Sequence, residues 1–252
     1  MNLSIENIKK SYDEKMAVDD ISFEIDRGET VGILGPNGAG KTTLFYIIAG
    51  LIRCDEGRLS LSGTELKNKS ISERTSMGLS YLPQESSIFR GLSVEQNIFA
   101  ALEQRKDLNQ EEKILKLSEL LEEFNLKEFS KTLGIKLSGG ERRRTEIARS
   151  LASNPKFILL DEPFAGIDPI AVSDLKNTIR SLNKKNIGVL ISDHNVRDTM
   201  NICSKVLVVN KGKIIASGLP EEIAKDDLVR DCLLYTSPSP RDQRGSRMPS
   251  SA

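Results

Sequence analysis

The sequence predicts an α/β fold with a parallel-sheet core, an antiparallel β subdomain and a helical subdomain. Three short, continuously apolar stretches, 29–35, 156–162 and 187–193, have the length and composition of buried strands. Helical patterns follow the first two of them, at 42–50 and 171–182. Strands that alternate with helices are typical of a parallel sheet, so these stretches define the predicted core.

The antiparallel part is predicted from the N-terminal segments 3–12 and 17–26. Both alternate apolar and polar residues, as half-buried strands of an antiparallel sheet do. Further short strands are expected at 58–63 and 78–84, and 205–218 has the pattern of a hairpin that turns at a glycine. The N-terminal strands and the hairpin therefore give the parallel core an antiparallel edge.

A mostly helical region is expected from about Ser93 to Ala152. Within it, Glu112–Phe124 repeats leucine-type residues at helical spacing. We expect one domain over 1–230, with the helical subdomain at about 85–153.

The last residues differ in character from the rest of the chain. Leu233–Ala252 is rich in Ser, Pro and Arg and has no apolar period, which predicts disorder. It also resembles adaptor-derived translation, so we interpret the tail at 231–252 as non-native coding sequence. Resequencing the genomic locus tests this, since an identical in-frame tail there would refute it.

Composition excludes several classes of protein. Lys plus Arg and Asp plus Glu both number 36, so no net charge draws the chain to nucleic acid or anionic lipid. There is no signal-peptide core and no apolar run of 18 residues, so membrane contact is expected through partners alone. The three cysteines, Cys54, Cys203 and Cys232, have neither disulfide nor metal-site spacing, and they fit a reducing cytosol.

The glycine-rich loop Gly35–Thr42 matches the phosphate-binding pattern G-x-x-x-x-G-K-[ST] in full. Its glycines let backbone N–H groups surround a β-phosphate. Lys41 supplies a positive charge between the β- and γ-phosphates, and the hydroxyl of Thr42 can bind Mg²⁺. A chance glycine-rich turn is the alternative, but the buried strand before the loop and the helix after it favour a phosphate-binding nucleotide site.

Polar residues follow three other strands. Asp161 ends a buried strand, where a carboxylate can reach Mg²⁺, and Glu162 is expected to point to the other side of an extended chain and polarise a water. His194, the single histidine, follows another buried strand at the edge where α/β sheets bind ligands. Alone, an Asp-Glu pair can be a solvated strand end, and Gln84 in a loop carries little information.

A second anion-binding helix start occurs at Leu137–Glu141, which reads LSGGE. Ser138 can cap the helix while Glu141, three residues on, completes a capping box. Two glycines expose backbone N–H groups at the positive end of the helix dipole. A capping box also begins purely structural helices, so the sequence leaves open why one domain carries two such starts.

Together these motifs resemble the nucleotide-binding subunits of ABC transporters over essentially residues 1–230. The phosphate loop, a glutamine loop, the LSGGE signature, the FILLDE strand, the AGID loop at Ala165–Asp168 and a switch histidine occur in the expected order. The resemblance implies that Glu162 and His194 are catalytic. It implies a magnesium site at Thr42, Gln84 and Asp161. It implies nucleotide contacts from Tyr12, Gly35, Pro36, Asn37, Gly38, Ala39, Gly40, Lys41, Thr42 and Thr43.

The resemblance also explains the second helix start. In this family two subunits pair head to tail, and each signature helix caps the γ-phosphate held by the other subunit. It implies a homodimer in which the opposite site is completed by Leu137, Ser138, Gly139, Gly140, Glu141, Gly166 and Asp168.

Finer details are similar to the ATPases of lipopolysaccharide export, the LptB family. LSGGERRRTEIARSLASNPKFILLDEPFAGIDPIAV and GLSYLPQESSIFRGLSV carry this similarity. It implies two transmembrane permease partners, a groove lined by Phe89 and Arg90 that receives them, and a place on the cytoplasmic face of the inner membrane. Gly91 departs from the bulkier, often basic residue of the family, and the family's own C-terminal end is replaced from about 228–232.

Three other functions stay open. Related motifs occur in the ATPases of branched-chain amino acid importers, which usually carry an extra insertion in the helical region. A soluble ABC ATPase that acts on ribosomes or DNA is disfavoured by the single phosphate loop and the absence of net positive charge. A regulatory module that binds but does not hydrolyse ATP is disfavoured by intact Glu162 and His194.

Overall fold

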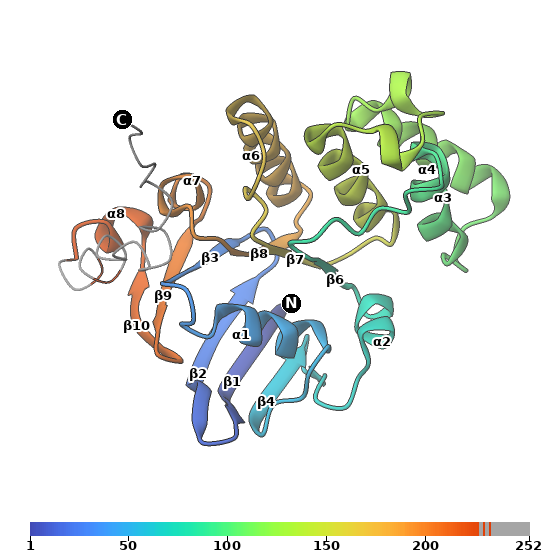
Figure 1. The fold of residues 1–252 in the computed structure, drawn as a ribbon. Helices are drawn as coiled ribbons and strands as arrows, with labels where there is room; N and C mark the ends of the chain where they lie inside the picture. Colours follow the sequence, from blue (N-terminus) through green and yellow to red (C-terminus); the bar gives the residue numbers. More distant parts are fainter. Residues whose placement is uncertain (227–228, 230–231, 233–252) are drawn as a thin grey trace, which may run out of the picture.

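The computed structural model describes residues 1–226, 229 and 232, and its core is a six-stranded sheet (Figure 1). The strand order is β10-β9-β3-β8-β7-β6. The strands are β3 (Thr30–Leu34), β6 (Leu79–Leu82), β7 (Phe157–Asp161), β8 (Gly188–Ser192), β9 (Lys205–Asn210) and β10 (Lys213–Gly218). Strands β9, β3, β8, β7 and β6 are parallel, and β10 pairs with β9 as an antiparallel hairpin. The predicted parallel core and hairpin are confirmed.

A second sheet of four antiparallel strands has the order β2-β1-β4-β5. Its strands are β1 (Asn2–Tyr12), β2 (Lys15–Asp26), β4 (Glu56–Leu61) and β5 (Thr64–Glu65). Helix α1 (Lys41–Ala49) lies between the two sheets, where Leu44 and Phe45 are fully buried (Figure 1). The antiparallel prediction is confirmed, and this packing fixes the helix that follows the glycine-rich loop.

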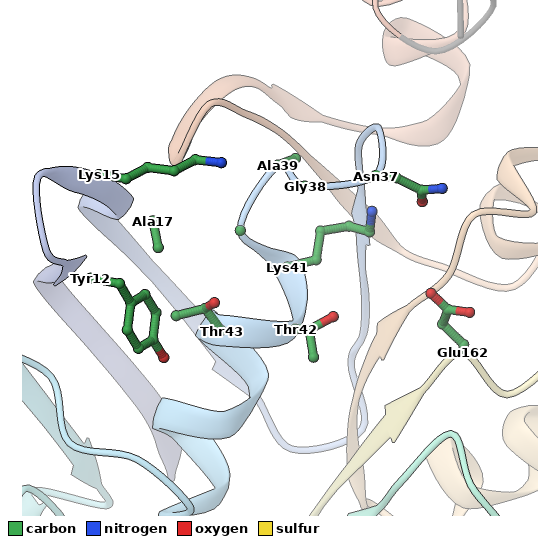
Figure 2. Close-up of a pocket in the computed structure, with 11 residues that line it drawn as sticks. Tyr12, Lys15, Ala17, Asn37, Gly38, Ala39, Lys41, Thr42, Thr43 and Glu162 are labelled. Atoms are coloured by element: carbon green, nitrogen blue, oxygen red, sulfur yellow. The ribbon is translucent and has the colours of Figure 1, made fainter. Parts of the chain in front are cut away.

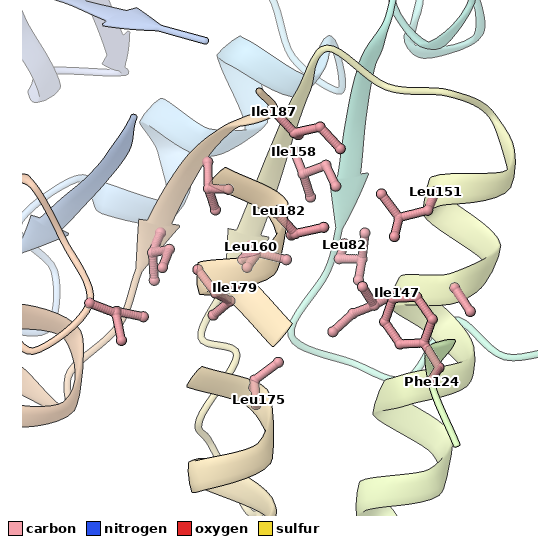
Figure 3. Close-up of a cluster of buried hydrophobic side chains, with 14 of the residues drawn as sticks. Leu82, Phe124, Ile147, Leu151, Ile158, Leu160, Leu175, Ile179, Leu182 and Ile187 are labelled. Atoms are coloured by element: carbon pink, nitrogen blue, oxygen red, sulfur yellow. The ribbon is translucent and has the colours of Figure 1, made fainter. Parts of the chain in front are cut away.

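The opposite face of the core sheet is covered by helices (Figures 1 and 3). Helices α5 (Gly139–Ala152) and α6 (Pro169–Lys184) lie on this face, and α3 (Val94–Glu103) and α4 (Gln110–Glu123) pack against α5, with two 3₁₀ turns at Lys127–Phe129 and Gly134–Lys136. Successive residues of β7 point to opposite faces of the core sheet. Ile158 and Leu160 pack against α5 and α6, whereas Phe157 and Leu159 pack on the side of α1. The period of two in a strand therefore builds two cores from one sheet.

Three short helices were not predicted: α2 (Ile71–Ser76), α7 (Val196–Met200) and α8 (Pro220–Ile223). Helix α2 begins with a capping box formed by Ser70 and Glu73. Among the described residues, no helix has the length and apolar character needed to cross a bilayer. The disorder predicted for Leu233–Ala252 concerns residues that lie outside the described part of the chain.

Candidate nucleotide site

The glycine-rich loop follows β3 and turns into α1 with a backbone that only glycine adopts easily. Gly40 has a φ of 105°, and a Cβ placed there would lie 2.2 Å from the carbonyl oxygen of Ala17. A Cβ at Gly35 would lie 2.1 Å from the carbonyl oxygen of Val209. Helix α1 begins at Lys41 without a side-chain cap, so its first N–H groups are available to an anion.

A pocket of about 290 Å³ opens at this loop (Figure 2). It is lined by Tyr12, Lys15, Ala17, Asn37, Gly38, Ala39, Gly40, Lys41, Thr42, Thr43 and Glu162. Tyr12 stands at one end with its ring half exposed, opposite Glu162 at the other end. Sequence reasoning missed Lys15 and Ala17, which the turn from β1 to β2 brings to the pocket.

Lys41 is held inside the loop. Its Nζ donates hydrogen bonds to the carbonyl oxygens of Gly35 at 2.6 Å and Pro36 at 3.0 Å. Burial lowers the pKa of Lys41, and the nearby carboxylates of Glu162 and Asp161 oppose that shift. The loop therefore carries a positioned cation at the start of α1.

Three predicted residues meet at the carboxyl ends of adjacent strands. Nε2 of Gln84, after β6, donates to Oε2 of Glu162, after β7, at 2.8 Å. Nδ1 of His194, after β8, lies 3.3 Å from the same oxygen. A second pocket of about 480 Å³ here is lined by Gly35, Pro36, Asn37, Gln84, Glu162, His194 and Val196. The strand order thus gathers an amide, a carboxylate and an imidazole in front of the phosphate loop.

The backbone at Glu162 corrects one prediction. Glu162 is not extended: its φ is 43°, in the left-handed region, and its N–H donates to the carbonyl of Ser192 at 2.6 Å. A residue other than glycine in this region is strained and needs surrounding structure to hold it. The turn, rather than strand alternation, directs the Glu162 side chain toward Gln84 and His194.

Asp161 has the environment of a metal-binding carboxylate. It is buried, its Oδ2 accepts from the hydroxyl of Tyr81 at 3.2 Å, and its Oδ1 has no hydrogen-bond partner among the described residues. Burial raises the pKa of Asp161 to about 6. A buried oxygen without a donor fits a cation ligand, and Thr42, which can supply a hydroxyl, lines the pocket that Glu162 also lines. The part of the chain that the structure describes holds no cluster of three or more His, Cys, Asp or Glu suited to a metal.

Asp193 was not predicted as part of the site. It is fully buried, its Oδ2 accepts from the backbone N–H of Phe164 at 3.0 Å, and its Oδ1 accepts from that of Asn195 at 2.7 Å. Burial raises the pKa of this carboxyl. Asp193 therefore joins the turn after Glu162 to the loop of His194. Asp193 could have been predicted as part of the site from its position beside His194, at the end of the same strand.

The signature begins α5 with the predicted capping box. The N–H of Ser138 donates to Oε2 of Glu141 at 2.9 Å, and that of Glu141 donates to Oγ of Ser138 at 3.4 Å. Ser138 and Gly139 are exposed, and neither lines the two pockets at the phosphate loop. Gly166 is exposed, and Asp168 caps α6 by accepting from Ile170 and Ala171. These residues lie on the surface, apart from the chain's own phosphate loop.

A groove of about 450 Å³ lies between the segment after β6 and the helical region. It is lined by Thr75, Ser80, Tyr81, Leu82, Ser87, Phe89, Ala100, Ala101, Gln104, Glu146, Arg149, Ser150 and Ser153. The ring of Phe89 is 52% exposed, and the guanidinium of Arg149 lies 5.0 Å from its centre. Arg90 is exposed and is not among the lining residues.

The phosphate loop between two sheets, the strand-end carboxylates and the signature helix together define an ATP-binding cassette ATPase. The family described as ABC transporter matches residues 18–165, and the chain belongs to this family. It hydrolyses ATP, as the family does.

Comparison with known proteins shows which ATP-binding cassette ATPases this chain is similar to. The lipopolysaccharide export system ATP-binding protein LptB of Haemophilus influenzae is 52% identical over 228 residues, which cover 90% of this chain and 95% of that protein. LptB of Escherichia coli K12 is 48% identical with the same coverage. Among solved structures, the ADP conformation of the ATP-binding cassette MJ1267 matches with a TM-score of 0.83 and 28% identity, covering 93% of this chain and 99% of that one.

Proposed function

We propose that this chain is the ATP-hydrolysing subunit of a lipopolysaccharide-export transporter. The observation that carries the proposal is identity of 48–52% over nearly the whole length of the LptB proteins, combined with a complete strand-end site. We infer that residues 1–230 form the ATPase domain, with the helical subdomain at about 85–153.

Hydrolysis is assigned to the strand-end cluster. Tyr12 would stack on the adenine, and the backbone of the phosphate loop with Lys41 would hold the phosphates. Glu162 would orient a water for in-line attack and accept its proton, while Gln84 fixes the carboxylate from one side. His194, beside the same oxygen, would contact the γ-phosphate.

Mg²⁺ fits the donors present. Thr42 would supply a hydroxyl, Gln84 an amide oxygen and Asp161 its unpaired carboxylate oxygen. The ion would neutralise charge on the transferring phosphoryl group. Oε1 of Gln84 could bind the ion while its Nε2 keeps the hydrogen bond to Glu162, because the amide oxygen and the amide nitrogen are separate groups.

A complete site requires two copies of the chain. Ser138 and Gly139, at the start of α5, are exposed and lie outside the chain's own pockets, so they would cap the γ-phosphate of a second subunit. Gly166 and Asp168 would lie at the same interface. The homodimer would close over two nucleotides, and closure would depend on the difference in affinity of ATP and ADP for the closed form.

The groove beside Phe89 would receive the membrane subunits. Its exposed aromatic side chain and its apolar lining suit a docked helix. Through these subunits the dimer would sit at the cytoplasmic face of the inner membrane.

Purification of the native complex from membranes tests the transported substrate. We expect two membrane proteins to co-purify and lipopolysaccharide to stimulate the ATPase of the complex. Phe89→Ala should release the membrane subunits, whereas Leu115→Ala, an exposed leucine on α4, should not. Co-purification of amino acid permeases, with stimulation by branched-chain amino acids, would contradict lipopolysaccharide export.

A further inference from the structure

A buried carboxylate joins helix α5 to the segment that carries Gln84. Glu146, on α5, is only 4% exposed. Its Oε1 accepts hydrogen bonds from Oγ of Ser86 at 2.7 Å and from the backbone N–H of Ser87 at 2.8 Å. Glu146 therefore holds the chain immediately after Gln84.

Arg143, on the same helix, holds the chain immediately before Gln84. Its Nη1 donates to the carbonyl of Pro83 at 3.2 Å and to Oε2 of Glu146 at 3.1 Å. Nε and Nη2 of Arg143 are buried without a partner in the part of the chain that is described. A buried ion pair with unsatisfied donors adds little to stability, so its value lies in fixing geometry.

The same helix connects two parts of the proposed machinery. At its beginning are Ser138 and Gly139, which under the proposed function cap the partner's phosphate. In the middle of the helix, Arg143 and Glu146 hydrogen-bond to the segment that contains Gln84. Gln84 in turn donates a hydrogen bond to Glu162 at 2.8 Å. A rigid helix with contacts at both places moves them together.

We propose that Glu146 is a positioning residue that couples the signature helix to Gln84. In the dimer this would link capping of the γ-phosphate in the partner's site to the orientation of Glu162 in the chain's own site. The inference rests on the proposed function of the signature helix and of Gln84. When α5 shifts on closure, the pair Arg143–Glu146 carries residues 83–87 with it. Glu146 acts through Gln84 and does not touch the nucleotide.

A kinetic double-mutant cycle on the full-length protein tests this. Gln84→Ala and Glu146→Ala should each lower kcat by about tenfold or more, because misplaced catalytic groups cost rate steeply. In Glu146→Ala the KM for ATP should stay within about twofold, since the side chains that line the pocket at Tyr12 and the phosphate loop are unchanged. The double variant should be no slower than the slower single variant. Effects that multiply would overturn the proposal.

Two further variants separate positioning from folding. Thr145→Val changes the neighbouring buried residue of α5, whose Oγ1 donates to the carbonyl of Glu141 at 2.8 Å, and should keep the wild-type kcat. Glu146→Gln keeps the volume and one acceptor oxygen, so it should fold and show a kcat between those of wild type and Glu146→Ala. A wild-type kcat in both Glu146 variants, or an equal loss in Thr145→Val, would refute the coupling.

The cycle also distinguishes a failure of the proposed role of Gln84 from a failure of the coupling through Glu146. If Gln84→Ala retains wild-type turnover, the role of Gln84 in the proposed function fails and this inference fails with it. If Gln84→Ala is slow while the Glu146 variants are normal, only the coupling through Glu146 fails.

Discussion

Nδ1 of His194 lies 3.3 Å from Oε2 of Glu162, the oxygen that also accepts the hydrogen bond from Gln84. The two residues follow neighbouring parallel strands, and Asp193 ties their loops together through the N–H of Phe164. Glu162 is therefore held from both sides, which suits the general base assigned to it in the proposed function.

Replacement of this base should separate ATP binding from hydrolysis. Glu162→Gln keeps the size of the side chain but removes the proton acceptor, so turnover should fall by about 100-fold or more. The variant should bind ATP and accumulate as a closed dimer, measured by phosphate release and by size-exclusion chromatography with ATP. Glu85→Gln makes the same chemical change at an exposed position and should behave as wild type. Wild-type turnover in Glu162→Gln would show that another group is the base.

Removal of the loop cation should weaken nucleotide binding. Lys41→Ala deletes the charge and the two hydrogen bonds to Gly35 and Pro36, so the affinity for ATP should fall by about tenfold or more, or about 1.4 kcal/mol. Titration calorimetry measures the change. Lys213→Ala, which removes a surface lysine paired with Asp19, is the matched control and should bind normally. Equal affinities in the two variants would exclude Lys41 from phosphate binding.

Arg74 should be a stability determinant that supports the phosphate-loop helix. Its buried guanidinium donates to the carbonyls of Ile47 and Ile48 at the end of α1, and to those of Leu66 and Lys69. Arg74→Met removes all of these hydrogen bonds, although the carbonyls of Ile47 and Leu66 keep the N–H donors of Gly50 and Lys69. The loss should lower the free energy of unfolding by about 3 kcal/mol or more. Urea denaturation measures this.

The control for this change is an exposed arginine. Arg58→Met, on β4, should alter the free energy of unfolding by no more than about 0.5 kcal/mol. If Arg74→Met is no less stable than Arg58→Met, the bonds to the end of α1 contribute nothing to stability.

The raised pKa of Asp161 predicts a pH dependence of stability in metal-free buffer. Its folded pKa of about 6 exceeds its ordinary value of 3.8, so the folded state binds this proton more tightly than the unfolded state. That contribution is complete below pH 3.8 and is lost as pH rises through 6. Asp161→Asn, which cannot ionise, should therefore gain stability relative to wild type between pH 4 and 7, by on the order of 2–3 kcal/mol.

Urea midpoints of both proteins, measured with a chelator across this range, check the sign. The difference should level off above pH 7, where Asp161 is ionised in both states. A difference that stays constant with pH would show that the Asp161 carboxyl has an ordinary pKa.

The local structures and their order could be predicted from the sequence. Gly35 and Gly40 permit the tight loop, where a Cβ would collide with a neighbouring carbonyl, and the Ser138–Glu141 capping box formed as predicted because its hydrogen bonds join residues three apart. The apolar runs of β3, β7 and β8 likewise carry their own burial signal. Such features depend on neighbours in the chain, so composition and spacing suffice to predict them.

The tertiary structure alone decided which distant residues meet. The order β8-β7-β6 brings His194, Glu162 and Gln84 to one edge, and the left-handed turn at Glu162 replaced the extended conformation that was predicted. The hydrogen bonds that Glu146 accepts from the segment after Gln84 could likewise not be predicted from the sequence. These contacts join residues far apart in the chain, and no local pattern encodes them because their energies depend on how whole elements pack.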